Sequence, residues 1–329
     1  MLSLACVVAT VGAFQSTPWT RAPTHVTRGG ALEAAKNSAF VFVKPHAITE
    51  PTIELVRSKL GAAGVEILGE GDIASEEIDE KQLIDQHYYA LASKATQTPP
   101  AELAMDAGKF KDFFGEEWAD VLKDGRAVTA IDACKRLGCD GAALDEKWGA
   151  AKGAGDIVKL GGGFYCGKLE GGLYTFNAFF MSMRDRFTQP GGKIHYFSVA
   201  WDAADLSWAD FRGTLLGPTD PSAAPPASIR GTIFSDWKDL GLKTAPNTGD
   251  NGVHASASPF EGLAERMNWL GVAPVDDPFG SLCIDAGLTD ATIKDWVLDP
   301  VVGGGSLFDA LEDSDVGPCL SKLGELNAL

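Results

Sequence analysis

The segment Asp250-Asn-Gly-Val-His-Ala-Ser-Ala-Ser-Pro-Phe-Glu261 carries the most specific structural signal in this chain of 329 residues. Its last four residues have the form of a capping box with proline at the first helical position, so we expect a helix to begin at Pro259. Gly271 predicts the end of that helix. His254 therefore lies just before a helix N-terminus, where free amides and the helix dipole favour an arriving phosphate group.

The chain before this segment opens with alternating strand and helix signals. Ala39-Phe-Val-Phe-Val43 predicts a buried strand, 52–60 a helix, and Val65-Glu-Ile-Leu68 a second strand. Residues 75–94 predict one amphipathic helix. The run Gly69-Glu-Gly-Asp-Ile-Ala74 spells G-x-G-x-x-A, a dinucleotide-binding pattern, but its two carboxylates would face the pyrophosphate. We interpret it as a strand-to-helix turn.

The middle and the end of the chain have a different character. Alanine, lysine and acidic residues dominate from 98 to 159, which predicts an inserted helical unit. Strand signals resume at 163–167 and 173–177, a predicted hairpin, and again at 193–201. The expected units are a presequence over 1–36, a domain in two parts over 37–97 and 160–273, the helical insertion over 98–159, and a helical C-terminal extension over 274–329.

Composition excludes several classes of protein. The 28 basic and 45 acidic residues give a net charge of −17, which disfavours nucleic acid or an anionic membrane as the main partner. After the N-terminal region, no run approaches the ~18 apolar residues of a membrane span. The six cysteines are scattered without a C-x-x-C pair, so we expect reduced thiols rather than disulfides or a zinc site.

The first 32 residues differ from the rest because they contain no acidic residue. An apolar stretch over 2–14 is followed by a basic segment rich in Ser and Thr, which indicates a targeting peptide. The two-part pattern resembles the presequences of plastids acquired by secondary endosymbiosis, and it predicts a plastid or secretory route. The alternative is a frayed N-terminus of a cytoplasmic protein.

Four short blocks, taken in order, resemble the nucleoside diphosphate kinase family across residues 39 to 271. They are Phe42-Val-Lys-Pro45, Gln86-His-Tyr88, Leu216-Gly-Pro-Thr-Asp-Pro221 with Ser228-Ile-Arg-Gly231, and Asn251-x-x-His254-Ala-Ser256. The resemblance implies an α/β (α+β) fold of the ferredoxin-like type, with a four-stranded antiparallel sheet and helices on one face.

The same resemblance implies the roles of the site residues. His254 would take the γ-phosphate of a nucleoside triphosphate and pass it to a nucleoside diphosphate, and Glu265 would fix the tautomer of its ring. Ser256 would contribute locally, and Mg²⁺ would bridge phosphate oxygens. The residues expected to surround the phosphates are Lys44, Tyr88, Arg212, Thr219, Arg230 and Asn251. Taken singly, most have plainer explanations, such as a core position for Tyr88 or a turn at Thr219.

The sequence also departs from the family pattern. Ala255 and Ala257 replace a glycine and an aspartate of the signature, and Gly213 stands where the family has an arginine, with Arg212 one step away. About 90 extra residues separate Tyr88 from Arg212, where part of the family's lid over the base lies, so the aromatic residue of that lid cannot be assigned. The long loop between Arg230 and Asn251 argues against the family's usual hexamer and leaves another homo-oligomer open. A scaffold module that binds nucleotide and docks a protein partner through 98–159 is the main alternative, and phosphate transfer to a protein is a third.

Overall fold

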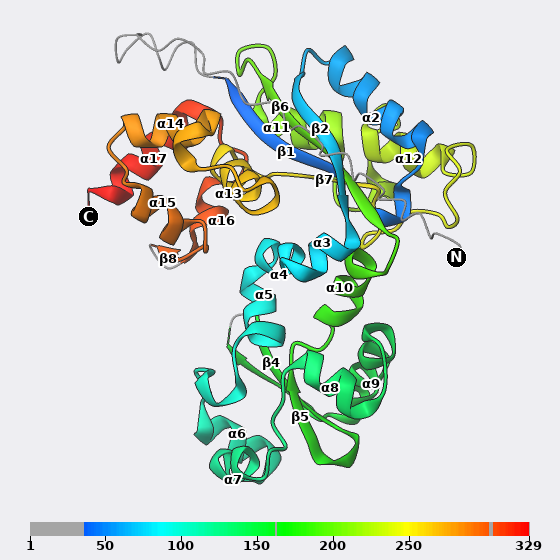
Figure 1. Ribbon diagram of the computed structural model, residues 1–329, viewed down its shortest axis with the longest axis vertical. Helices are drawn as coiled ribbons and strands as arrows, with labels where there is room; N and C mark the ends of the chain where they lie inside the picture. The colour runs from blue at the N-terminus through cyan, green and yellow to red at the C-terminus, as the bar shows by residue number, and fades with distance from the viewer. Residues whose placement is uncertain (1–35, 162, 303–304, 329) are drawn as a thin grey trace, which may run out of the picture.

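A computed structural model describes residues 36–161, 163–302 and 305–328 of the chain (Figure 1). Apart from Lys36, the presequence expected over 1–36 lies outside the described residues. The route that it implies therefore stays a prediction.

Four strands form one antiparallel sheet in the order β2-β6-β1-β7. Helix α2 (Glu50–Ala62) joins β1 to β2, and α12 (Ile229–Asp236) lies between β6 and β7. The two strand-helix-strand units interleave, because β6 lies between β1 and β2 while β1 lies between β6 and β7. This is the ferredoxin-like topology, so the predicted fold class is confirmed. The strands are β1 (Asn37–Val43), β2 (Glu66–Ala74), β6 (Lys193–Trp201) and β7 (Val253–Ala255).

Helices cover both faces of this sheet, so the expectation of helices on one face is wrong. The odd-numbered residues from Ala39 to Val43 pack into a core shared with α2 and α12. Phe40 and Phe42 point to the opposite face, as alternate residues of a strand must, and pack there with Trp269 of α13 (Pro259–Leu270). Figure 1 shows α2 and α13 on opposite sides of β1.

Two local predictions beside the sheet are wrong. Residues 69–74 do not form a turn, because they continue β2 and pair with β6 up to Ala74 opposite Lys193. The single helix expected over 75–94 is divided where Gln82 adopts a φ of 53° and Tyr88 a φ of −107°. It comprises α3 (Ser75–Glu80), α4 (Leu83–His87), α5 (Tyr89–Ala92) and a π-turn, η2 (Ser93–Gln97).

The insertion forms a unit of its own beside the four-stranded sheet. Its helices are α6 (Ala107–Phe114), α7 (Trp118–Lys123), α8 (Ala130–Leu137) and α9 (Gly141–Ala154), with a short turn η3 (Pro100–Glu102) before them. They share two buried cores with a three-stranded sheet of β3 (Ile157–Gly161), β4 (Phe164–Leu169) and β5 (Leu173–Phe176). The predicted hairpin β4–β5, closed by η4 (Glu170–Gly172), is present. The boundary expected at residue 159 therefore falls inside this sheet, because 160–176 pack with the insertion.

The chain returns from the insertion through α10 (Phe180–Thr188) to β6, and short elements then lead to the last strand. These are α11 (Trp208–Asp210), the π-turn η5 (Phe211–Leu216) and η6 (Pro221–Ala223). A further short turn, η1 (Pro45–Ala47), follows β1.

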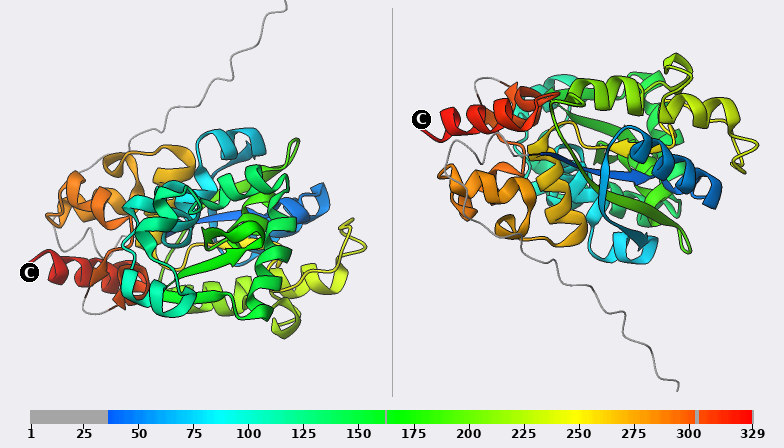
Figure 2. Two further views of the ribbon diagram at one scale, coloured as in Figure 1. Left: turned by 90° about the horizontal axis from the view of Figure 1, so that it is seen from below. Right: turned by 90° about the horizontal axis from the view of Figure 1, so that it is seen from above.

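The C-terminal extension packs against α13 and reaches the start of β1, where Asn37 Oδ1 accepts from the backbone N–H of Val316, and both views of Figure 2 show its helices gathered at one side of the molecule. Phe260 and Leu263 of α13 join its buried core. Arg266 of the same helix is buried and donates from Nε to Asp277 Oδ2 at 2.6 Å. The extension contains η7 (Pro274–Asp276), α14 (Pro278–Asp285), α15 (Asp290–Trp296), β8 (Val301–Val302), β9 (Gly305–Ser306), α16 (Leu307–Leu311) and α17 (Val316–Asn327).

Candidate active site

His254 lies in the middle of β7, a strand of three residues at one edge of the sheet. It is paired with Phe42 of β1, and the two rings stack with their centroids 4.7 Å apart. Its neighbours Val253 and Ala255 are buried in the core on the opposite face. The strand therefore directs the imidazole toward α13. The sequence predicted only a non-helical segment here, because three residues are too few to give a strand pattern.

The helix that faces the imidazole has the boundaries that the sequence predicts. It begins at Pro259 after the cap residue Ser258, whose Oγ accepts a hydrogen bond from the backbone N–H of Glu261. It ends before Gly271, which has a φ of 66° that favours glycine. The capping residues thus determine where the helix starts, and this places Glu265 two turns further on, opposite His254.

Glu265 is held by one hydrogen bond to each of its carboxylate oxygens. Its Oε1 lies 2.6 Å from His254 Nε2, and its Oε2 accepts a hydrogen bond of 2.6 Å from Ser256 Oγ. Ser256 Oγ in turn accepts from the backbone N–H of Phe40 in β1. The structure therefore brings the three predicted catalytic residues into one hydrogen-bonded chain.

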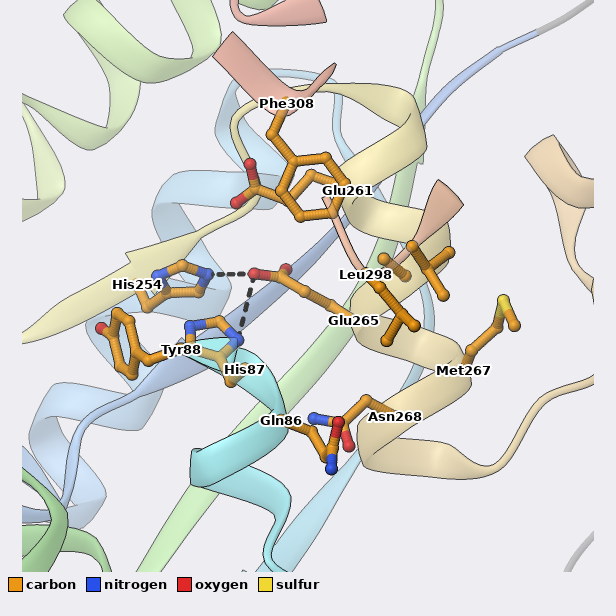
Figure 3. Close-up of a pocket in the computed structure, with 12 residues that line it drawn as sticks. Gln86, His87, Tyr88, His254, Glu261, Glu265, Met267, Asn268, Leu298 and Phe308 are labelled. Atoms are coloured by element: carbon orange, nitrogen blue, oxygen red, sulfur yellow. Dashed lines mark hydrogen bonds and ion pairs between the residues drawn. The ribbon is translucent and has the colours of Figure 1, made fainter. Parts of the chain in front are cut away.

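The environment keeps the imidazole neutral. Burial, followed by the charges of Lys44, Arg230 and Arg212, holds the pKa of His254 well below its ordinary value of 6.5. Burial also raises the pKa of Glu265 to about 7, so the carboxylate form predominates above neutrality. An ionised Glu265 accepts the hydrogen bond from Nε2, which leaves the lone pair of His254 on Nδ1. Figure 3 shows this second nitrogen pointing away from Glu265.

A cleft of about 430 Å³ is lined by His254 but not by Glu265, so it lies on the other side of the ring from the carboxylate. Residues from strand ends, loops, helices and the C-terminal extension contribute to it. The structure brings to this cleft all the residues expected to surround the phosphates, namely Lys44, Tyr88, Arg212, Thr219, Arg230 and Asn251.

Arg230 ties two walls of the cleft together. Its Nη1 donates to the carbonyl of Gly217 at 2.8 Å, in the loop that carries Thr219, while Nε and Nη2 donate to the carbonyl of Val253 at 3.1 and 2.8 Å. Burial and then the charge of Arg212 lower its pKa to about 10, so it remains a cation at neutral pH. Arg230 thus supplies positive charge to the cleft and fixes the backbone beside His254.

Lys44 and Asn251 leave polar groups available for a ligand. Lys44 follows the end of β1, and its Nζ makes one hydrogen bond, to the carbonyl of Gly249 at 3.2 Å. Asn251 is 2% exposed and donates from Nδ2 to the carbonyl of Thr219 at 3.0 Å. Its Oδ1 is buried and has no partner within the described part of the chain. A buried acceptor without a partner costs about 1–3 kcal/mol, which a ligand's donor would offset.

Arg212 faces the cleft but is already engaged by the C-terminal extension. Its Nη1 donates to Glu312 Oε1 at 2.8 Å and to Asp313 Oδ1 at 2.6 Å. Both carboxylates line the cleft as well. No sequence pattern indicates this contact, because the two segments lie about 100 positions apart in the chain. Ala255, in contrast, fits its position, since it pairs with Val41 in an extended strand that needs no glycine.

A second cavity of about 420 Å³ lies on the Glu265 side of His254 (Figure 3). Its walls include Leu298 and Phe308 of the C-terminal extension. His87, the last residue of α4, also lines it, with Nδ1 3.4 Å from Glu265 Oε1. His87 belongs to the motif Gln86-His-Tyr88, but its role could not be predicted, because a single histidine at the end of a short helix leaves no periodic signal.

A smaller cavity of about 210 Å³ adjoins the cleft and shares Lys44 and Tyr88 with it. Met183 and Phe187 of α10 supply its apolar wall. Burial raises the pKa of Tyr88 to about 12, so its hydroxyl keeps its proton and can donate it in a hydrogen bond.

Comparisons with known proteins give limited information. No model of a protein family matches the chain, and no curated protein matches its sequence. The solved structures that are similar include nucleoside diphosphate kinases from Encephalitozoon cuniculi (14% identity, 79% of this chain and 99% of that one), Pyrobaculum aerophilum (18%, 71% and 95%) and Aquifex aeolicus (13%, 71% and 95%). Each has a TM-score of 0.36, which is too low to establish a family. Function must therefore be argued from the site.

Within the described ranges, no helix has the length and apolar character needed to cross a membrane.

Proposed function

We propose that the chain catalyses phosphate transfer between nucleotides, as a nucleoside diphosphate kinase does, with His254 as the residue that carries the phosphate. The observation that carries this proposal is the position of one neutral imidazole. Its Nε2 is held 2.6 Å from a buried carboxylate, and its ring lines a cleft that also contains Lys44 and Arg230. A nucleophilic histidine needs a fixed tautomer, which Glu265 provides on one side of the ring. It also needs cations beside the phosphate, which lie on the other side of the ring.

The reaction follows from the protonation states. The lone pair on His254 Nδ1 attacks the γ-phosphorus of a nucleoside triphosphate, and the bond from that phosphorus to the bridging β–γ oxygen breaks. The electrons of that bond leave with the nucleoside diphosphate, and a phosphohistidine remains. A second diphosphate then attacks the same phosphorus, and the P–N bond breaks to restore the imidazole. Glu265 supports both steps because it stabilises the positive charge that develops on the ring.

The cleft and the small cavity beside it suit a nucleotide. Lys44, Arg230 and the hydroxyl of Tyr88 would contact the phosphates, with Thr219 at the exposed rim of the cleft. The sugar hydroxyls can donate to the buried Oδ1 of Asn251, which has no protein partner in the part of the chain that the structure describes. The base would then lie against Met183 and Phe187 in the adjoining cavity.

Mg²⁺ would enter with the nucleotide and neutralise charge on the phosphate oxygens. The carboxylates that line the cleft are poor ligands for this ion. Glu312 and Asp313 are bonded to Arg212, and burial raises the pKa of Glu261 to about 8. A cleft with this donor set fits an ion that is held through phosphate oxygens rather than through a protein cage.

One observation favours a second function, that of a nucleotide-binding module without transfer. Arg212 is neutralised by Glu312 and Asp313, so the cleft has one cation fewer for the transition state and two carboxylates close to the phosphates. Such a module would use the insertion, with its separate core, to bind a protein partner.

Incubation of the purified protein with γ-labelled ATP and Mg²⁺ separates the two functions. The proposal expects an acid-labile label on the wild type that GDP removes as labelled GTP, and no label on His254→Ala. His195→Ala is a matched control, because His195 lies on β6, bonded to Asp72 and outside the cleft. Nucleotide binding without label on the wild type would contradict transfer and support the binding module. A label that only a protein acceptor removes would support transfer to a protein instead.

A further inference from the structure

Three groups that can each bind a metal ion meet on the Glu265 side of the catalytic imidazole. His87 Nδ1, His254 Nε2 and Glu265 Oε1 all lie within 4.8 Å of one another. His87 Nδ1 and Glu265 Oε1 are 3.4 Å apart, and His254 Nε2 and Glu265 Oε1 are 2.6 Å apart. In Figure 3 both rings direct a nitrogen toward the same carboxylate oxygen.

The hydrogen bonds show that His87 offers a lone pair at this point. The indole Nε1 of Trp269 lies 3.3 Å from His87 Nδ1 and can only donate, so Nδ1 is the unprotonated nitrogen. Nδ1 also lies 3.4 Å from Glu265 Oε1, which is a second acceptor when the carboxylate is ionised. Two electron-rich atoms therefore approach each other with no proton between them, and a cation placed there would relieve their repulsion. An ion bound to Nδ1 would take the place of the indole N–H on its lone pair.

We propose that His87, His254 and Glu265 form a binding site for a divalent transition-metal ion of the zinc type. Two imidazole nitrogens and one carboxylate oxygen are a common set for zinc with an open fourth position. Bonds of about 2.0–2.1 Å place the ligands of a tetrahedral ion roughly 3.3 Å apart, close to the separation between His87 and Glu265. The contact between His254 and Glu265 must lengthen when the ion displaces the proton between them. The adjoining cavity of about 420 Å³ has room for a water molecule as fourth ligand.

Metal binding would change the tautomer of His254. In the metal-free state the proton is on Nε2 and the lone pair is on Nδ1, which faces the phosphate cleft. An ion on Nε2 moves the proton to Nδ1, so the ring stays neutral but has no lone pair to attack phosphorus. The ion is therefore a reversible inhibitor of phosphate acceptance. This consequence rests on the phosphate transfer proposed above, whereas metal binding itself does not.

The test uses the full chain carrying Cys134→Ser, which disrupts the neighbouring pair of partly exposed thiols, Cys134 and Cys139, as an alternative zinc site. Calorimetric titration with Zn²⁺ should give one site per chain, and Co²⁺ should give the absorption bands of a four- or five-coordinate ion. His87→Gln should weaken Zn²⁺ binding at least about tenfold. His195→Gln is the matched control, because His195 contacts the carboxylate of Asp72 but belongs to no group of three potential metal ligands in the described part of the chain. This variant should bind Zn²⁺ as the parent does.

Glu265→Gln provides a second variant in case His87→Gln does not fold, and the Co²⁺ spectrum needs no variant at all. The site is contradicted if the parent shows no stoichiometric Zn²⁺ binding, or if folded His87→Gln and Glu265→Gln bind as tightly as the parent. The labelling reaction is then run with and without Zn²⁺ for each protein. Zn²⁺ should lower the labelling rate of the parent but not that of His87→Gln, when each rate is compared with that of the same protein without metal. Metal binding without any labelling would contradict the phosphate transfer and leave the metal site intact.

Discussion

The two cavities that meet at His254 differ in chemistry and in origin. The cleft on the Nδ1 side is formed by turns at strand ends and contains the cations Lys44 and Arg230. The cavity on the Nε2 side is formed by α4, α13 and the C-terminal extension, and holds Glu265 among apolar side chains. The difference implies a division of labour, in which one side binds the phosphates and the other sets the state of the ring. Changes on the two sides should therefore affect different quantities, affinity on one side and rate on the other.

The largest effect on rate is expected from Glu265→Gln. Both carboxylate oxygens accept hydrogen bonds, from His254 and from Ser256. An amide has only one acceptor oxygen, so one of these donors loses its partner. The labelling rate with γ-labelled ATP should fall roughly 100-fold while the nucleotide Kd changes little.

Glu170→Gln is the control for this variant, because Glu170 bonds to Lys147 in the inserted unit and lines neither cavity. Its rate should stay within a few-fold of wild type. A normal labelling rate with a large loss of nucleotide affinity in Glu265→Gln would contradict the division of labour between the two sides of the ring.

Lys44→Met, on the cleft side, is expected to change the affinity for nucleotide rather than the rate of labelling. Hydrogen bonds from charged groups contribute about 1.5–3 kcal/mol, so nucleotide affinity should weaken roughly 10- to 100-fold. Equilibrium binding of a labelled diphosphate measures this directly. Lys59→Met is the control, because Lys59 bonds to the carbonyl of Ala227 outside the cleft and its loss should leave the Kd unchanged. An unchanged Kd in Lys44→Met would remove this residue from the phosphate site.

A smaller effect, in the favourable direction, is expected where the extension reaches the cleft. Glu312→Gln with Asp313→Asn removes both partners of Arg212 and two negative charges near the phosphates. Asparagine also tolerates the φ of 56° at position 313. Nucleotide affinity should rise by about 1 kcal/mol, or roughly fivefold. Adding Arg212→Met should cancel this increase in nucleotide affinity. An increase that persists without Arg212 would show that release of Arg212 is not its cause.

The smallest effect concerns pH. Burial, with the charge of Arg230, lowers the pKa of Lys44 from 10.5 to about 8. The amine is a cation below that pH and becomes neutral as pH rises through it, so diphosphate affinity should decline a few-fold between pH 7 and pH 9. Lys44→Met should have a flat profile over the same range. A decline that persists in Lys44→Met would assign the titration to a different group.

The same contrast explains what could be predicted from the sequence. The capping residues around Pro259 and Gly271 are local signals, so the boundaries of α13 could be read directly. Apart from Arg212, the cleft residues could be named because each belongs to a short motif at the end of an element. The fold class followed from the order of those motifs, and the sheet order agrees with it.

The remaining features depend on contacts between distant segments. The breaks at Gln82 and Tyr88 divide a helix whose apolar spacing is regular, so the pattern alone does not show them. The contact of Arg212 with Glu312 joins charged residues that would otherwise be solvated, and nothing in either segment indicates the other. The role of His87 beside Glu265 likewise arises only when α4 packs against α13. Tertiary packing, rather than local propensity, determines each of these.

The proposed phosphate transfer requires that the phosphoryl group bonds to Nδ1 of His254. Wild-type protein labelled with ATP can be digested at alkaline pH, the phosphopeptide identified by mass spectrometry, and the position of the phosphate on the ring assigned by NMR. We expect phosphate on Nδ1 of His254, since Nε2 is hydrogen-bonded to Glu265. Phosphate on Nε2, on another residue or on none would contradict this expectation.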